Sequence, residues 1–276
     1  MRFLRCIQAC LLLCCLGPPP AATAAETFHL GVAPHSSVRI VIAQYQPLRA
    51  ALQGALEIPV EVSTARDFTA FMRRALAFDY DIVITTAHQA AVLRDDAGFI
   101  PLLTYRADFE AVAVSAFDSG IVNVRELNAR PVLGLNPASL VTLWGIDLLE
   151  KNQVRAKSLA YITASDSVAE LVLRGEAAAG FMSLANYQKL AHEMRARLRI
   201  VARSGPLPGR VYLLSPKCAA HEKTVRATLA SFAGGDAGQR YFAENQLGGY
   251  RPIKRAELDA MRNYADAVRR QLRDDR

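Results

Sequence analysis

The chain has 276 residues, of which 51% are hydrophobic and 21% are charged, and its formal net charge at pH 7 is +7. A chain of this length can bury the core of one or two domains without the support of disulfides. The basic residues are diluted by 26 acidic residues and form no block, so the composition argues against nucleic-acid binding and indicates a weak attraction for anions.

The first 25 residues have the pattern of an export signal. Arg2 and Arg5 precede an apolar run, Cys6 to Leu16, and a tail of alanine and threonine follows. The apolar run has about eleven residues, whereas a bilayer span needs roughly 20. We therefore expect cleavage after Ala24 or Ala25 and a mature protein that works outside the cytoplasm.

Removal of this leader leaves a single cysteine in the mature chain. Four of the five cysteines belong to the leader: Cys6, Cys10, Cys14 and Cys15. The alternative to cleavage after Ala24 or Ala25 is a lipoprotein modified at Cys14 or Cys15. The residues before these cysteines are Leu13 and Cys14, whereas a lipidation site has a small residue there. Only Cys218 remains, so we expect no intrachain disulfide, and its place after an apolar run predicts an inert thiol rather than a nucleophile.

The mature chain begins with alternating strand-length apolar runs and amphipathic helical stretches, which is the pattern of an α/β fold. Strands are predicted at Phe28 to Val32, Pro59 to Ser63 and Tyr80 to Thr85, and helices at Val38 to Leu56 and from about Ala65 to Ala77. Loops are predicted at 33–37 and 86–88, after the first and third strands. These elements indicate three parallel strands joined by crossover helices.

The pattern changes after Pro101. Strands are predicted at 102–105 and 110–116 with no helix between them, as in a passage from one lobe to another. A second α/β set follows, with strands at 131–135, 159–162 and 178–182, a loop at 163–166, and helices at 140–151 and 167–173. The runs 199–202 and 210–214 flank a Gly- and Pro-rich return at 204–209, and the helical tail is broken at 234–235 and 248–252.

Two passages between lobes predict a hinged clamp in which lobe two is inserted in lobe one. Lobe one is expected at 26–108 and 206–276, and lobe two at 109–205. The cleft between such lobes is the expected ligand site, at strand ends and helix N-termini that favour anions. Polar residues stand at these places: His35, Ser36 and Ser37, then Thr85, Thr86 and His88, then Asn136 and Ser139, then Thr163, Ser165, Asp166 and Ser167.

Six short segments carry a resemblance to a known family: Gly31 to Pro34, Tyr45 to Leu48, Tyr80 to Val83, Asn136 to Ser139, Arg174 to Gly180 and Ser204 to Pro208. In their order and spacing, over nearly all of residues 26–265, the chain resembles the phosphate/phosphite/phosphonate substrate-binding proteins of periplasmic ABC transporters. The resemblance implies a two-lobe type II periplasmic-binding-protein fold. It also implies capture of a small anionic ligand in the periplasm for delivery to a permease, by a monomer without cofactors.

The resemblance further implies an oxyanion site, formed by an aromatic residue of the first helix and by hydroxyls at the start of a lobe-two helix. Tyr45 and Ser139 stand at those places, and Thr142 is the next hydroxyl along the helix. The hydroxyl cluster of the family is reduced here to Ser139-Leu140-Val141. Since lost donors weaken the binding of a buried anion, the pocket takes another ligand or rebuilds its donors from His35, His88 and Arg210.

Two further departures concern charge: Asp166 stands where the family has a histidine, and Arg210 where it has an acidic residue. The predicted ligand contacts are His35, Ser36, Tyr45, Thr85, Thr86, His88, Ser139, Thr142, Asp166 and Arg210. Several have a structural alternative: His35 as an exposed loop residue, Tyr45 in the core, His88, Ser139 or Asp166 as a helix cap, and Arg210 at a solvated rim. Asp166 could also recognise an amine.

The sequence predicts no enzyme. It contains no Gly-x-Ser-x-Gly elbow, and its five histidines form no His-Glu-x-x-His pattern, so neither a nucleophile nor a metal site is indicated. The alternative to transport is a periplasmic sensor module that reports its ligand state to a membrane kinase or cyclase, because both functions use the same clamp.

Overall fold

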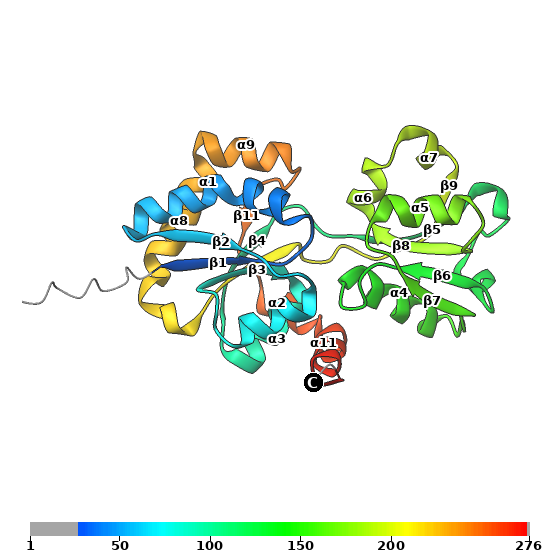
Figure 1. Cartoon of the computed structure of the whole chain (residues 1–276), viewed down its shortest axis with the longest axis horizontal. Coiled ribbons are helices and arrows are strands. Elements are labelled where there is room, and N and C mark those ends of the chain that lie inside the picture. The colour runs from blue at the N-terminus through cyan, green and yellow to red at the C-terminus, as the bar shows by residue number, and fades with distance from the viewer. Residues whose placement is uncertain (1–26, 275–276) are drawn as a thin grey trace, which may run out of the picture.

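The computed structural model describes residues 27–274 and shows two lobes joined by extended passages (Figure 1). The predicted export signal, its cleavage site and the lipidation alternative lie outside the described residues. Along residues 27–274, no helix has the length and apolar character needed to span a membrane.

The lobe that contains the first described residues is built on a six-stranded sheet with the order β11-β4-β10-β3-β1-β2. Its strands are β1 (Phe28–Val32), β2 (Val60–Ser63), β3 (Ile82–Thr86), β4 (Ile100–Tyr105), β10 (Arg210–Leu214) and β11 (Tyr250–Arg251). β1 is parallel to β2 and β3, whereas β10 is antiparallel to β3 and β4. β10 therefore begins at the sheet edge where β3 ends, and Arg210 is in register with Thr86.

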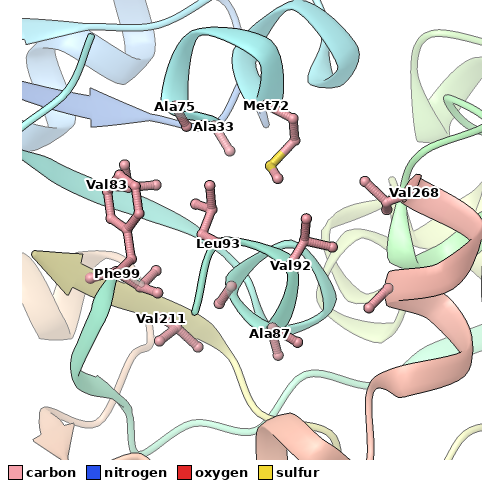
Figure 2. Close-up of a cluster of buried hydrophobic side chains, with 14 of the residues drawn as sticks. Ala33, Met72, Ala75, Val83, Ala87, Val92, Leu93, Phe99, Val211 and Val268 are labelled. Atoms are coloured by element: carbon pink, nitrogen blue, oxygen red, sulfur yellow. The ribbon is translucent and has the colours of Figure 1, made fainter. Parts of the chain in front are cut away.

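Helices cover both faces of this sheet (Figure 1). One face carries α1 (Val38–Leu56), α8 (Glu222–Gly234) and α9 (Asp236–Glu244), and the other carries α2 (Phe68–Leu76), α3 (Ala87–Ala97), α10 (Arg255–Asp259) and α11 (Arg262–Asp274). Figure 2 shows Met72 of α2, Leu93 of α3 and Val268 of α11 in one buried cluster. Because both faces of the sheet are covered, side chains on both sides of its central strands are buried, and these strands are predominantly hydrophobic in sequence.

The second lobe contains a five-stranded sheet with the order β7-β6-β8-β5-β9. Its strands are β5 (Ala111–Ala116), β6 (Pro131–Gly134), β7 (Ser158–Tyr161), β8 (Ala179–Ser183) and β9 (Leu198–Arg203), and its helices are α4 (Leu140–Lys151), α5 (Ser165–Leu173), α6 (Leu184–Lys189) and α7 (His192–Ala196). α4 packs on one face through Trp144, and α5 packs on the other through Val168. The chain enters and leaves this lobe between β4 and β5 and between β9 and β10, so lobe two is inserted in lobe one.

The two passages between the lobes are paired. Phe109 and Leu207 form an antiparallel bridge in which each N–H donates to the carbonyl of the other at 2.8 Å. α11 contacts both α3 and α4. Gln271 Nε2 donates to the carbonyl of Pro137 at 3.1 Å, and the Tyr264 hydroxyl donates to Asp147 Oδ2 at 3.2 Å. The C-terminal helix thus ties the lobes together beside the paired passages.

Several predicted elements have the observed bounds, including the helices at 38–56 and 140–151 and the strand at 210–214. Two predicted loops are wrong. Residues 86–88 end β3 and open α3, because Ala87 and Ala90 are buried against the sheet, and Ser165 and Asp166 already belong to α5. The sequence did not indicate the short helices α6 and α7 or the two-residue strand β11, which exists only through its pairing with β4.

Candidate functional site

A cleft of about 1380 Å³ lies between the lobes. Lobe one lines it with residues 34–37, the starts of α2 and α3, and the residues around Arg210; lobe two lines it with residues 135–141, 161–166 and 183–191. Residues 245–247, after α9, also reach it. The cleft therefore lies between the two lobes, next to the passages that join them.

Six helices begin at this cleft, and the residue that precedes each helix lines it: Ser37 for α1, Asp67 for α2, Thr86 for α3, Ser139 for α4, Ala164 for α5 and Ser183 for α6. The first N–H groups of a helix lack partners within the helix and carry the positive end of its dipole. Side chains cap four of these starts, but Thr86 and Ala164 make no side-chain cap bond to α3 and α5. This arrangement favours an anion in the cleft.

The structure divides the predicted ligand contacts into two groups. On the cleft wall lie His35, Ser36, Thr86, Ser139, Asp166 and Arg210. Outside the cleft lining, each with no more than a trace of exposed surface, lie Tyr45, Thr85, His88 and Thr142. The second group projects into the lobe cores from the same elements, since residues that neighbour a ligand contact on a strand or helix point to another face.

His35 follows β1 and is half-buried. Its Nδ1 lies 2.8 Å from the carbonyl of Ala33, which can only accept, so Nδ1 carries the proton. Its Nε2 lies 3.3 Å from Oε1 of Gln44. Burial, together with the positive charges of Arg210 and Lys189, lowers the pKa of His35 to about 3. His35 is therefore neutral near pH 7 and contributes a hydrogen-bonding ring rather than a charge.

Thr86 precedes α3 at the end of β3. Its Oγ1 is buried and has no hydrogen-bond partner among the described residues, although the residue lines the cleft. A buried hydroxyl without a partner is uncommon in folded proteins. Thr86 thus holds a hydroxyl that a bound molecule can satisfy.

Ser139 is the N-cap of α4, which the sequence suggested as the alternative to ligand contact. It also lines the cleft. Its Oγ accepts from the N–H of Thr142 at 3.3 Å and donates to Thr142 Oγ1 at 3.0 Å. Thr142 is fully buried and supports Ser139 from behind. Ser36, one residue before the α1 cap, is an exposed residue of the rim.

His88 and Thr85 are internal residues rather than wall residues. His88 Nε2 lies 3.0 Å from the carbonyl of Ala138, so it donates across the boundary between α3 and the loop before α4. Burial lowers the pKa of His88 to about 4, and its Nδ1 has no partner among residues 27–274. The hydroxyl of Thr85 donates to Oε1 of Gln89.

Tyr45 belongs to a buried network of five tyrosine side chains, which we call the tyrosine cluster: Tyr45, Tyr105, Tyr212, Tyr241 and Tyr250. The hydroxyl of Tyr105 is its centre, at 3.5 Å from that of Tyr45, 2.8 Å from that of Tyr212 and 2.5 Å from that of Tyr241. Tyr250 donates to Tyr212 at 2.9 Å. Of the cluster, Tyr105 lines the cleft, and the Tyr45 ring lies edge-on to His35 with centroids 6.3 Å apart.

Burial raises the pKa of Tyr105, Tyr212 and Tyr241 well above the usual value, so these phenols are neutral. This cluster was not predicted from the sequence, because its members come from five separate elements: α1, β4, β10, α9 and β11. The alternation along β10 was its only visible trace, since Arg210 and Tyr212 are two residues apart and share one face of the sheet.

Arg210 is the first residue of β10 and lies on the cleft wall. Within residues 27–274, no carboxylate forms an ion pair with its guanidinium. Burial lowers its pKa, but the tyrosines around it, Tyr45 and Tyr105 first, outweigh burial and leave the pKa above its usual value. Arg210 is therefore a charged, partly buried cation with only neutral phenols beside it.

Lys189, which the sequence analysis did not single out, is the last residue of α6 and lines the cleft from lobe two. It is exposed and forms no ion pair within the described part of the chain. Three of the four acidic residues on the wall have cationic partners: Asp67 with Arg66 at 3.0 Å, Asp108 with Arg251 at 3.7 Å and Glu110 with Arg203 at 3.3 Å. The fourth, Asp166, is exposed in the first turn of α5, where its Oδ1 accepts from the N–H of Ser167 at 2.8 Å.

Residues 27–274 contain no group of three or more His, Cys, Asp or Glu side chains placed to hold a metal ion. Cys218 lies in lobe one, outside the cleft lining, with its Sγ 3.0 Å from Oδ1 of Asp81. The cleft thus offers hydroxyls, backbone N–H groups and, within residues 27–274, two cationic side chains without an acidic partner, Arg210 and Lys189.

Solved structures with this fold include three proteins that match nearly the whole chain. XAC2383 from Xanthomonas citri, solved with ATP, shares 19% sequence identity with this chain; the match covers 90% of this chain and 98% of XAC2383, with a TM-score of 0.75. PhnD1 from Prochlorococcus marinus, solved with methylphosphonate, shares 12% identity over 88% of this chain and 98% of its own, with a TM-score of 0.75. PA3383 from Pseudomonas aeruginosa, a binding protein component of an ABC phosphonate transporter, shares 15% identity over 89% of this chain and 87% of its own, with a TM-score of 0.74.

The structural similarity to these proteins establishes the two-lobe type II periplasmic-binding-protein fold. At such low sequence identities it establishes nothing further. A search of proteins with curated descriptions found no match. The family model for periplasmic phosphonate substrate-binding proteins of ABC transporters, however, matches residues 30–258, which span both lobes. The chain therefore belongs to the family of periplasmic substrate-binding proteins of phosphonate ABC transporters.

Proposed function

We propose that the protein captures a small phosphorus oxyanion, of the phosphonate, phosphite or phosphate type, in the interlobe cleft and delivers it to the permease of an ABC transporter. The observation that carries this proposal is the convergence of helix N-termini from both lobes on a cleft that also holds the unpaired Arg210. Helix starts bind phosphate-like groups through unpaired N–H groups and the helix dipole.

The structural neighbours support this ligand class. PhnD1 was solved with methylphosphonate and XAC2383 with ATP, and both ligands carry phosphorus oxyanions. The family model describes a transporter component, which favours transport over a sensor role. The family is periplasmic, and we propose that this chain reaches the periplasm through a cleaved export signal.

The proposed mechanism is closure of the lobes on the ligand. The paired passages at Phe109 and Leu207 are the proposed hinge, which assigns residues 26–108 and 206–276 to lobe one and 109–205 to lobe two. A ligand that touches both walls binds the closed state better than the open state, so it shifts the equilibrium towards closure. We propose that the closed form, as a monomer, is the one that the permease recognises.

We propose that the ligand contacts are the predicted residues on the wall. Thr86 would donate its hydroxyl, Ser139 would contribute its hydroxyl and the helix start behind it, and neutral His35 would accept through its Nε2 lone pair from a protonated oxygen of the ligand. Arg210 would supply a positive charge that attracts an anionic ligand to the cleft. Tyr45, Thr85, His88 and Thr142 would then act as supports behind the wall rather than as contacts.

We propose binding without catalysis and without a cofactor. Transport proteins of this family bind and release their substrate unchanged, and the wall pairs no nucleophile with a general base. The fully buried His88 is held by Ala138, and the neutral His35 is held by Ala33.

Calorimetric titration of the exported form with phosphate, phosphite, methylphosphonate, sulfate and acetate tests this proposal. We expect saturable binding of at least one phosphorus oxyanion. The variant Thr86→Val should weaken that binding by about tenfold to a hundredfold, because a hydroxyl bonded to a charged acceptor contributes about 1.5–3 kcal/mol. Since Oγ1 of Thr86 has no partner in the free protein, Thr86→Val should leave the stability of that form within about 0.5 kcal/mol of its starting value.

The matched control is Thr85→Val, the neighbouring hydroxyl that is bonded to Gln89 and points away from the cleft. It should lower stability and leave affinity unchanged. Absence of binding to all phosphorus oxyanions, or equal affinity losses in Thr85→Val and Thr86→Val, would contradict the proposed site.

A further inference from the structure

We propose that the ligand carries a second anionic group, a carboxylate, in addition to its phosphorus oxyanion, and that Arg210 of lobe one and Lys189 of lobe two hold this second group between them. The inference rests on the proposed function and names the ligand class within it. It follows from two cations on opposite walls of the cleft that the protein leaves uncompensated.

The two cations face the same part of the cleft. Arg210 begins the strand that follows the hinge, and Lys189 ends α6 on the other lobe. Both residues line the cleft. His35 lines the same cleft, and the positive charges of Arg210 and Lys189 both lower its pKa. Like charges that approach from two lobes repel each other, so closure needs an anion between them.

The protein supplies no counter-charge to Arg210. Four members of the tyrosine cluster act on its charge, and burial raises the pKa of three of them, Tyr105, Tyr212 and Tyr241, so these phenols stay protonated. The cluster therefore offers Arg210 oxygen dipoles but no negative charge. Burying a guanidinium without a carboxylate partner raises the free energy of the folded protein. Such an unpaired arginine in a cleft is typical of a site that binds an anionic ligand.

The acidic residues of the wall are engaged elsewhere. Asp67, Asp108 and Glu110 each pair with an arginine other than Arg210. Asp166 remains, but it is exposed at the start of α5 and is not among the charges that act on His35. The surplus charge around His35 is thus positive.

A single oxyanion does not use all of these donors. The helix starts behind Thr86, Ser139 and Ala164 line the cleft with N–H and hydroxyl groups, and such groups bind phosphate without a side-chain cation. Arg210 and Lys189 are then available to a second group. A carboxylate suits the pair, because the arginine fork is complementary to its two oxygens and the lysine adds a point charge.

The test compares three ligands that differ only in the group attached to one phosphonate: methylphosphonate, phosphonoacetate and aminomethylphosphonate. Titration calorimetry at one pH and one salt concentration should show phosphonoacetate binding at least tenfold more tightly than methylphosphonate. Aminomethylphosphonate should bind at least tenfold more weakly. The variants Lys189→Gln and Arg210→Gln should each reduce the advantage of phosphonoacetate to within about threefold.

Lys189→Gln is the decisive variant, because Lys189 is exposed and its replacement leaves the core unchanged. Lys157→Gln removes the same charge from an exposed position of lobe two outside the cleft, and it should preserve the advantage of phosphonoacetate. Circular dichroism of Arg210→Gln establishes whether that variant is folded.

Equal affinities for methylphosphonate and phosphonoacetate would overturn this inference while leaving the proposed function intact. Tightest binding of aminomethylphosphonate, lost in Asp166→Asn, would also overturn it and would assign amine recognition to α5. Absence of binding to all three phosphonates would overturn the proposed function and this inference with it.

Discussion

The two lobes meet the cleft in different ways. Lobe one presents Arg210 on a strand in the interior of its sheet, backed by the tyrosine cluster, in which every member except the half-buried Tyr250 is buried. Both lobes present helix starts to the cleft, and lobe two adds the exposed Lys189 at the end of a six-residue helix. The difference indicates that the binding groups of lobe one are held rigidly before the ligand arrives. Those of lobe two are more mobile and reach the ligand when the lobes close.

The largest expected effect concerns the wall of lobe one. Tyr105→Phe removes the hydroxyl that contacts those of Tyr45, Tyr212 and Tyr241. Since buried polar groups that lose their partners cost about 1–3 kcal/mol each, we expect a loss of about 3 kcal/mol in the free energy of unfolding, measured with urea. Tyr161→Phe removes an exposed hydroxyl from lobe two and should cost less than about 0.5 kcal/mol. Equal losses in the two variants would remove the distinction between the walls.

The next effect concerns the junction between the lobes, where His88 donates to Ala138. Burial lowers the pKa of His88 from 6.5 to about 4, so the folded protein binds this proton less readily than the unfolded chain. The associated stability is present above pH 6.5 and is lost as the pH falls towards 4. We expect a loss of about 2 kcal/mol between pH 7 and pH 5 from this residue, measured by urea unfolding at each pH.

His88→Gln places an amide N–H near the position of Nε2 and does not titrate. The variant should therefore lose less stability than the parent protein as the pH falls from 7 to 5, and what remains of the loss is assigned to His35, whose pKa is lowered in the same direction. Identical pH profiles for His88→Gln and the parent would refute the role of His88.

The smallest of these effects compares helix caps on the two walls. Ser139→Ala removes the cap of α4, whose hydroxyl makes two bonds to Thr142, and should cost about 1 kcal/mol. Ser37→Ala removes the cap of α1, which is exposed and makes one bond of 3.5 Å, and should cost less than half as much. Thermal unfolding of both variants tests the order, and a larger loss for Ser37→Ala would reverse the ranking of the caps.

Local pattern was a good guide wherever one element buries one continuous face. The leucines of α1 recur at helical spacing, and the helix runs over Val38–Leu56 as predicted. The loops after β3 and β7 were placed less well, because Thr86 to His88 and Ser165 to Asp166 have no apolar periodicity of their own. Contact with the sheet, rather than helix propensity, draws these residues into helices.

The sequence predicted which segments reach the cleft better than it predicted which side chains of those segments face it. Polar residues after strands identified Thr86 and Ser139, whereas neighbours with the same chemistry, Thr85 and Thr142, point into the cores. Successive side chains of a strand point to opposite faces, so a shift of one residue in the register would exchange Thr85 and Thr86. Thr142 lies one helical turn beyond Ser139, where the helix is already covered by the core. Lys189 lay in a stretch with no strand or motif to mark it.

The sequence by itself determined the α/β order of the elements, the passages between two lobes and the resemblance to the family, because these depend on hydrophobic period and on segments of contiguous residues. Tertiary structure alone decided which polar groups meet. It gathered five tyrosines from α1, β4, β10, α9 and β11 into one hydrogen-bonded cluster, neutralised His35 and His88 by burial, and brought Lys189 and Arg210 from different lobes to the same cleft. Contacts, burial and charge balance depend on residues that are far apart in the chain, and no local pattern records them.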